Sequence, residues 1–311
     1  MIRLILSLLS VVILFFSIGL IDIQPVMAQT ETQPEVTEIK TSTTTAETAA
    51  EPKITEAKAE SNTAETETQP SLSEEELKEK INELAQKAFE NTQNGDFVAA
   101  EGYWTQLIEL LPDNPALWSN RGNAKAAQNK FEEAIADYNK AMELAPNAPD
   151  PYLNRGMVLE TMGKFESAIK DYDRLLELSP DDAMGYNNRG SAKSGLGKWQ
   201  EAIADYQKAV ELAPYFAFAR ANYALALYQA GQTEVAIRTM RDIIRKYPQF
   251  PDMRAALTAA LWVQGQAGEA ESNWVATVGL NPRYKDIEWV KNVRRWPPLM
   301  VQALEKFLKL E

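Results

Sequence analysis

The chain is 311 residues long and contains neither cysteine nor histidine. Without these residue types it has no thiolate nucleophile, no imidazole base, no disulfide, and no zinc or haem site built from their side chains. Acidic residues outnumber basic ones by 44 to 32, and the resulting net charge of −12 argues against a nucleic acid or an anionic membrane surface as partner.

Residues 1–28 have the pattern of a secretory signal peptide. Arg3 supplies positive charge near the start, residues 4–21 are almost wholly apolar, and Val26 and Ala28 suit a cleavage site after Ala28. The apolar run is also about long enough to span a bilayer, so an uncleaved anchor is the alternative. Both interpretations predict an exported protein, and the lack of cysteine excludes a lipoprotein anchor.

Residues 29–72 are predicted to form a disordered acidic linker. Between residues 29 and 70 the chain has twelve threonines and nine glutamates, but no aromatic residue and no glycine. So few apolar side chains cannot bury enough surface to offset the conformational entropy of folding.

The rest of the chain repeats with a period of 34 residues, and six copies in one register are not a coincidence. A proline recurs at Pro112, Pro146, Pro180, Pro214, Pro248 and Pro282. An alanine recurs at Ala100, Ala134, Ala168, Ala202, Ala236 and Ala270. A glycine or asparagine recurs at Gly95, Asn129, Gly163, Gly197, Gly231 and Gly265. A large side chain recurs at Trp104, Tyr138, Tyr172, Tyr206, Met240 and Trp274.

This punctuation predicts two helices in each repeat. Glycine or asparagine tolerates the left-handed backbone that ends the first helix, the alanine permits close helix contact, and the proline ends the second helix. Pro115 and Pro151 stand where helices are expected to begin. Ser73 and Glu76 form a capping-box pattern that starts the first helix.

The pattern resembles the tetratricopeptide repeat family. The second unit matches the family best, with Trp118, Gly122, Ala134, Tyr138, Ala141 and Pro146 in place. The resemblance implies an all-α, right-handed solenoid of about six helix-turn-helix repeats within residues 73–284, made of units 81–114, 115–148, 149–182, 183–216, 217–250 and 251–284. The first, fifth and sixth units depart from the pattern at Asn91, Arg220 and Arg254, as expected of terminal units.

Residues 285–311 are predicted to form a C-terminal helical cap on the exposed edge of the sixth unit. Ile287, Val290 and Val293 have the spacing of one short helix, and residues 299–310 have that of a last one after the Trp296–Pro298 break. This end also resembles chloroplast-lumen members of the family, which would imply a cyanobacterial source and a thylakoid-lumen or periplasmic location.

In this family the first helix of each unit lines a concave groove. Four asparagines occupy the same place in successive units, and two more lie nearby, at Asn120, Asn154, Asn188, Asn222, Asn123 and Asn187. Side-chain amides carry donors and an acceptor, so such a column can pair with an extended peptide backbone of any sequence. The column resembles the asparagine ladder in the repeat region of O-linked N-acetylglucosamine transferase. The alternative is that these amides bond only to neighbouring turns or to water.

Other recurring side chains predict less. The family's carboxylate clamp for chaperone tails needs lysine and arginine at places that here hold Ser119, Met184 and Asn188, so chaperone-tail binding is not expected. A second set recurs next to the asparagines and on the second helices: Arg121, Arg155, Arg189, Asp137, Asp171 and Asp205. The arginine stems are predicted to pack across the solenoid, and the aspartates to form a solvated or internally paired face.

The groove positions carry few charges and the chain has no glycine-rich phosphate loop, so we expect no enzyme, no cofactor and no metal. We predict an exported interaction scaffold or assembly factor that binds an extended segment of a protein partner. The membrane is a partner only if the N-terminal segment is retained. The alternative is a structural subunit that docks edge-on into a membrane-associated complex through its outer helices or its cap.

Overall fold

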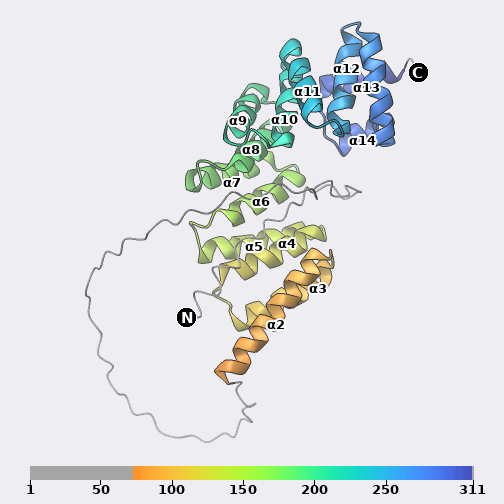
Figure 1. Ribbon diagram of the computed structural model, residues 1–311. Helices are drawn as coiled ribbons and strands as arrows, with labels where there is room; N and C mark the ends of the chain where they lie inside the picture. The colour runs from red at the N-terminus through yellow and green to blue at the C-terminus, as the bar shows by residue number, and fades with distance from the viewer. Residues whose placement is uncertain (1–72, 310–311) are drawn as a thin grey trace, which may run out of the picture. The chain divides into compact units, whose positions relative to one another are not determined.

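The computed structural model describes residues 73–309, which form fourteen α-helices and one short 3-10 helix and contain no strand (Figure 1). The predicted signal segment 1–28 and linker 29–72 lie outside these described residues. Of the helices between residues 73 and 309, none is both long enough and apolar enough to cross a bilayer. The all-α solenoid confirms the fold class expected from the repeats.

Twelve of the helices form six consecutive pairs. The first helices of the pairs are α2 (Glu74–Gln93), α4 (Pro115–Ala127), α6 (Asp150–Thr161), α8 (Ala183–Gly195), α10 (Ala217–Gln229) and α12 (Pro251–Val263). The second helices are α3 (Phe97–Leu110), α5 (Phe131–Leu144), α7 (Phe165–Leu178), α9 (Trp199–Leu212), α11 (Thr233–Lys246) and α13 (Ala267–Leu280). We number the pairs as units one to six.

The helix boundaries follow the predicted punctuation. The Ser73 amide and hydroxyl both donate to the Glu76 carboxylate, and the Glu76 amide donates back to Ser73, so the capping box is confirmed. Pro115 and Pro151 lie in the first turns of α4 and α6. All six predicted turn residues have left-handed backbone, with φ of 78° at Gly95, 60° at Asn129, 72° at Gly163, 72° at Gly197, 79° at Gly231 and 73° at Gly265.

The recurring alanines and large side chains form the interior of each unit. All six alanines have an exposed fraction of 0%, which lets the two helices of a pair approach closely. The six large side chains, from Trp104 to Trp274, are also buried. In unit three a β-carbon on Gly156 would lie 2.6 Å from Tyr172 Cε1, so only glycine leaves room for that ring.

From α3 onward, each helix packs against the next helix along the chain, and several first helices also touch one another. The latter contacts join α4 to α6, α6 to α8 and α8 to α10. They place the first helices on the inner side of the stack, and we call the surface that these helices form the inner face.

The C-terminal segment consists of η2 (Pro282–Lys285), α14 (Ile287–Asn292) and α15 (Pro298–Leu308). Helix α14 ends before Val293, which is 44% exposed and does not share its packing as predicted. Helix α15 packs on α12 and also reaches α10, so it covers first helices of two units and not only the edge of the sixth. The cap therefore lies over the inner face of units five and six.

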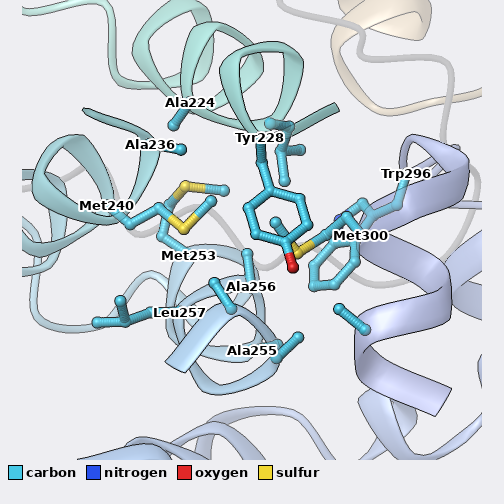
Figure 2. Close-up of a cluster of buried hydrophobic side chains, with 14 of the residues drawn as sticks. Ala224, Tyr228, Ala236, Met240, Met253, Ala255, Ala256, Leu257, Trp296 and Met300 are labelled. Atoms are coloured by element: carbon cyan, nitrogen blue, oxygen red, sulfur yellow. The ribbon is translucent and has the colours of Figure 1, made fainter. Parts of the chain in front are cut away.

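Buried apolar side chains are distributed unevenly along the stack. One continuous cluster runs from Ala202 in α9 to Phe307 in α15, and three smaller clusters serve the units before it. Figure 2 shows part of the large cluster, where Tyr228 of α10 lies among Met253, Met300 and Trp296. The cap is thus part of the core of units five and six.

Candidate functional site

The predicted asparagine column lies on four consecutive first helices of the inner face. Asn120 is on α4, Asn154 on α6, Asn188 on α8 and Asn222 on α10, and each is partly exposed. No residue between 73 and 309 makes a hydrogen bond to the side-chain amide of Asn120 or Asn154. These two amides keep their full donor and acceptor capacity for a ligand or for water.

The other four predicted asparagines have internal partners. The Asn187 amide donates to Asn188 Oδ1 at 3.1 Å and accepts from Asn222 Nδ2 at 3.0 Å, which links units four and five. Asn123 Oδ1 accepts from the Tyr138 hydroxyl at 2.8 Å. Asn123 and Asn187 therefore help to hold the repeats, while Asn188 and Asn222 each keep part of their capacity.

The arginine next to each column asparagine forms a two-pronged ion pair inside its own unit. In unit three Arg155 donates from Nε and Nη2 to the two carboxylate oxygens of Asp171, at 2.8 and 2.5 Å. Arg121 with Asp137 and Arg189 with Asp205 repeat the arrangement. These aspartates are among the few buried charged side chains of the described chain.

The third guanidinium nitrogen of each arginine crosses to the preceding unit. Nη1 reaches Thr105 from Arg121, Asn139 from Arg155 and Asp173 from Arg189, always 16 residues back along the chain. The predicted packing of arginine stems is therefore accompanied by a charged hydrogen-bond network that joins neighbouring units, and the aspartates are internally paired. The pairing with Asp137, Asp171 and Asp205 raises the pKa of the three arginines, so they stay charged.

Glu160 is an inner-face residue that the sequence analysis missed. It stands near the end of α6, at a repeat position where the neighbouring units have Ala126 and Ser194. The Tyr172 hydroxyl donates to its Oε2 at 3.1 Å. Burial raises the pKa of Glu160, while hydrogen bonds from Ser191 and Tyr172 and the positive charge of Arg295 act in the opposite direction. The one available signal was a carboxylate at a repeat position otherwise filled by neutral residues.

The cap shows how the inner face holds a chain segment. Asp252 Oδ1 accepts from the Tyr284 hydroxyl at 2.6 Å and from Trp296 Nε1 at 3.0 Å, and Oδ2 accepts from Arg294 Nη2 at 2.6 Å. The backbone N–H of Leu299 donates to the side-chain amide oxygen of Gln229 at 2.8 Å. A first-helix carboxylate and a first-helix amide thus bind side chains and backbone of the chain's own C-terminal segment.

The inner face carries amides and carboxylates that can bind a ligand. Residues 73–309 bring together no set of three carboxylates suited to a metal ion.

Comparison with protein families finds the TPR repeat model at residues 122–163, and tetratricopeptide repeat models at residues 149–182, 183–216 and 222–249. The chain is a tetratricopeptide repeat protein. Tetratricopeptide repeats support a role as a protein-protein interaction scaffold with a protein or peptide partner.

Among curated proteins, this tetratricopeptide repeat protein is similar to Hsp70-Hsp90 organizing protein 2 of Arabidopsis thaliana, with 43% identity over 47 residues. That match covers 15% of the chain and only 8% of the relative. A tetratricopeptide repeat protein from Parabacteroides merdae has a similar structure, with a TM-score of 0.55, 20% identity and coverage of 75% of this chain and 98% of that one. The APC/C hetero-tetramer Cut9-Hcn1 reaches a TM-score of 0.58 with 17% identity, over 75% of this chain and 46% of that one. These two structures support the fold.

Proposed function

We propose that this tetratricopeptide repeat protein binds an extended segment of a partner protein along the inner face of units two to four, and that it holds or positions that partner without catalysis. The observation that carries the proposal is the pair of unpartnered amides at Asn120 and Asn154, at the same repeat position on adjacent first helices. Asn188 and Asn222 continue the column on α8 and α10.

Main-chain recognition by such a column follows from the chemistry of the side chains. A carboxamide can donate to a carbonyl and accept from an N–H, so the column can bind a peptide backbone whatever side chains the peptide carries. The chain already contains one contact of this kind, between the Gln229 side chain and the Leu299 N–H. Units two to four leave the equivalent surface uncovered by α15, which reaches α10 and α12.

The test selects binding peptides from a phage-displayed library of randomised twelve-residue peptides, with the full chain as the target. Changing Asn120, Asn154, Asn188 and Asn222 to alanine together should weaken binding of the selected peptides by about 100-fold or more, since several hydrogen bonds are lost at once. A matched control changes four exposed amides away from the column, at Asn94, Gln200, Gln232 and Gln302.

Thermal unfolding must show that the fourfold column variant is still folded. The proposal is supported if the column variant loses the peptides and the control variant keeps them. Selected peptides that bind equally well to both variants would show that the column is not the binding surface.

A chaperone tail is not the expected ligand, although the curated relative is an Hsp70-Hsp90 organizing protein. The places that the family's clamp fills with lysine and arginine hold Ser119, Met184 and Asn188 here. Without cations at these places, the inner face cannot hold a terminal carboxylate in that way.

We further propose that the protein acts outside the cytoplasm, in the periplasm or the thylakoid lumen. The support is the signal-peptide pattern of residues 1–28 and the absence of cysteine. Mass spectrometry of the protein from its source should find a mature N-terminus at Gln29. A chain that retains residues 1–28 in the membrane fraction would instead support the anchor.

The alternative of edge-on docking gains little support. Most apolar side chains of the cap are buried in the core of units five and six, including Trp296, Met300 and Leu304. Of the large apolar side chains within residues 285–309, only Val293 and Leu299 are more than 40% exposed. The most exposed valines of the second helices, Val98 on α3 and Val275 on α13, belong to the first and last units and form no shared patch.

A further inference from the structure

Glu160, a partly exposed residue of α6, belongs to a small polar cluster between units three and four. The cluster consists of Glu160 and Tyr172 from unit three with Ser191, Ser194 and Tyr206 from unit four. Tyr172 bonds to Glu160 at 3.1 Å, and the Tyr206 and Ser194 hydroxyls are 3.2 Å apart. The Ser191 hydroxyl favours the charged form of Glu160 and lowers the pKa of Tyr206, against the larger effect of burial on both. We call this set the Glu160 cluster.

The cluster holds one carboxylate and no cation of its own. The one lysine of α8, Lys193, forms a salt bridge with Asp205 at 2.7 Å. Arg189 is likewise committed to Asp205 and Asp173. The positive charge that acts on Glu160 is that of Arg295, an exposed cap residue with left-handed backbone at φ 53°. Within residues 73–309 no ion pair is formed by Arg295.

The other end of the inner face shows what such a carboxylate binds. Asp252 near the start of α12 is occupied by the guanidinium of Arg294, the indole N–H of Trp296 and the hydroxyl of Tyr284. Arg294 and Trp296 belong to the segment that runs over α12 toward Gln229 of α10. In this molecule a chain segment that crosses the inner face therefore gives a cation to a first-helix carboxylate.

We propose that Glu160 is the position at which the inner face takes a lysine or arginine side chain of the bound segment. This inference rests on the proposed function, because the asparagine column would hold the backbone while Glu160 selects one side chain. The incoming cation would give Glu160 the ion pair that it does not form within residues 73–309. The Tyr172 hydroxyl already orients the carboxylate, so a charge-assisted hydrogen bond can form without rearrangement of the cluster.

The test selects peptides from the same randomised twelve-residue library on the full chain and on its Glu160→Gln variant. Glutamine keeps an acceptor for the Tyr172 hydroxyl and removes the charge. The unchanged chain should select lysine or arginine at one fixed position. The Glu160→Gln variant should still select peptides but lose that enrichment, and should bind the basic peptides about 10- to 100-fold more weakly. Glu166→Gln, at an exposed position of α7, is the matched control and should change nothing.

A second variant tests the part assigned to Arg295. Arg295→Ser should strengthen binding of the basic peptides by about threefold, because an exposed countercharge is removed, whereas Arg283→Ser in η2 should not. The inference is overturned if Glu160→Gln binds the basic peptides as tightly as the unchanged chain, or if acidic residues are enriched and Arg295→Ser abolishes their binding. If the fourfold asparagine variant loses the peptides while Glu160→Gln does not, this inference fails alone. If the unchanged chain selects no peptide, the proposed function and this inference fail together.

Discussion

Units two to four and units five to six are built on one repeat but are stabilised differently. At the repeat positions of the Arg–Asp pairs, units five and six have Tyr223 with Thr239 and Leu257 with Asn273. These last units share one apolar cluster with the cap and with α9 of unit four, whereas units two and three have small separate clusters. Charged hydrogen bonds join units two, three and four. The surface that is free to bind a partner lies where the stack depends least on a continuous apolar core.

The difference also separates two uses of one face. Over units five and six the inner face is covered by α15, and its alanines, Ala221, Ala255 and Ala259, are almost completely buried. Over units two to four the equivalent face retains partly exposed asparagines, and Asn222 extends this column onto α10 of unit five. The cap packs on the inner face of units five and six and stabilises them, whereas the inner face of units two to four remains accessible to a partner.

The sharpest contrast between the two regions is expected for two aspartates three repeats apart, Asp252 and Asp150. Asp252→Ala should lower the free energy of unfolding by about 3–5 kcal/mol, since it leaves the partly buried Arg294 and the buried Trp296 and Tyr284 without their shared acceptor. Asp150→Ala removes an exposed carboxylate and should change stability by less than about 0.5 kcal/mol. Urea unfolding followed by circular dichroism measures both, and equal effects would contradict the role assigned to Asp252.

A smaller effect is expected at the charged pair of unit three. Arg155→Ala should destabilise the protein by about 2–3 kcal/mol, because the buried Asp171 carboxylate loses its partner. The double change Arg155→Leu with Asp171→Asn copies unit six and should cost less than Arg155→Ala alone. Denaturant titration measures the free energy of unfolding of both variants. A double variant that is less stable than Arg155→Ala would show that the charged pair itself provides the stability.

Two glycines test packing against helix propensity. Gly156→Ala places a methyl group against the Tyr172 ring and should destabilise by about 1–3 kcal/mol. Gly102→Ala on α3 meets no atom within 4 Å and should stabilise by about 0.5–1 kcal/mol. Thermal melting of both variants should move in opposite directions, and a shared direction would rule out this packing of Tyr172.

The smallest effect expected is the pH dependence that arises from Glu160. Its pKa is raised in the folded protein by burial, so the folded state holds this proton more tightly than the unfolded chain. Its contribution to stability is therefore present at low pH and is lost as the pH rises from the ordinary glutamate pKa through the raised one. The Glu160→Gln variant should lose less stability than the unchanged chain over that interval, as measured by urea unfolding at several pH values. An identical slope for the two proteins would contradict the assignment.

The sequence predicted the repeating parts of the fold because the repeat shows them six times. The turn residues, the buried alanines and the large interior side chains all lie where the 34-residue register places them. It did not predict the partners of Arg155, since a contact over 16 residues depends on how two helices are rotated against each other.

Features that occur once were harder to derive. The Asp252 contacts and the position of α15 on the inner face depend on a tail outside the register, whose path no periodicity defines. The sequence analysis missed Glu160 for a related reason. Its carboxylate occurs in one unit, so it is not part of the repeated pattern from which the binding residues were predicted. The asparagine column was visible in the sequence, but only the structure shows that Asn120 and Asn154 have no partner in residues 73–309 while Asn123 and Asn187 do.

The most direct test of the binding face is the NMR signal of the Asn120 and Asn154 side-chain amides during titration with a selected twelve-residue peptide. The account predicts that both amides shift with the same midpoint as the bound peptide, while the control amides of Asn94 and Gln302 stay unchanged. Tight binding of the peptide with no shift at Asn120 or Asn154 would contradict it.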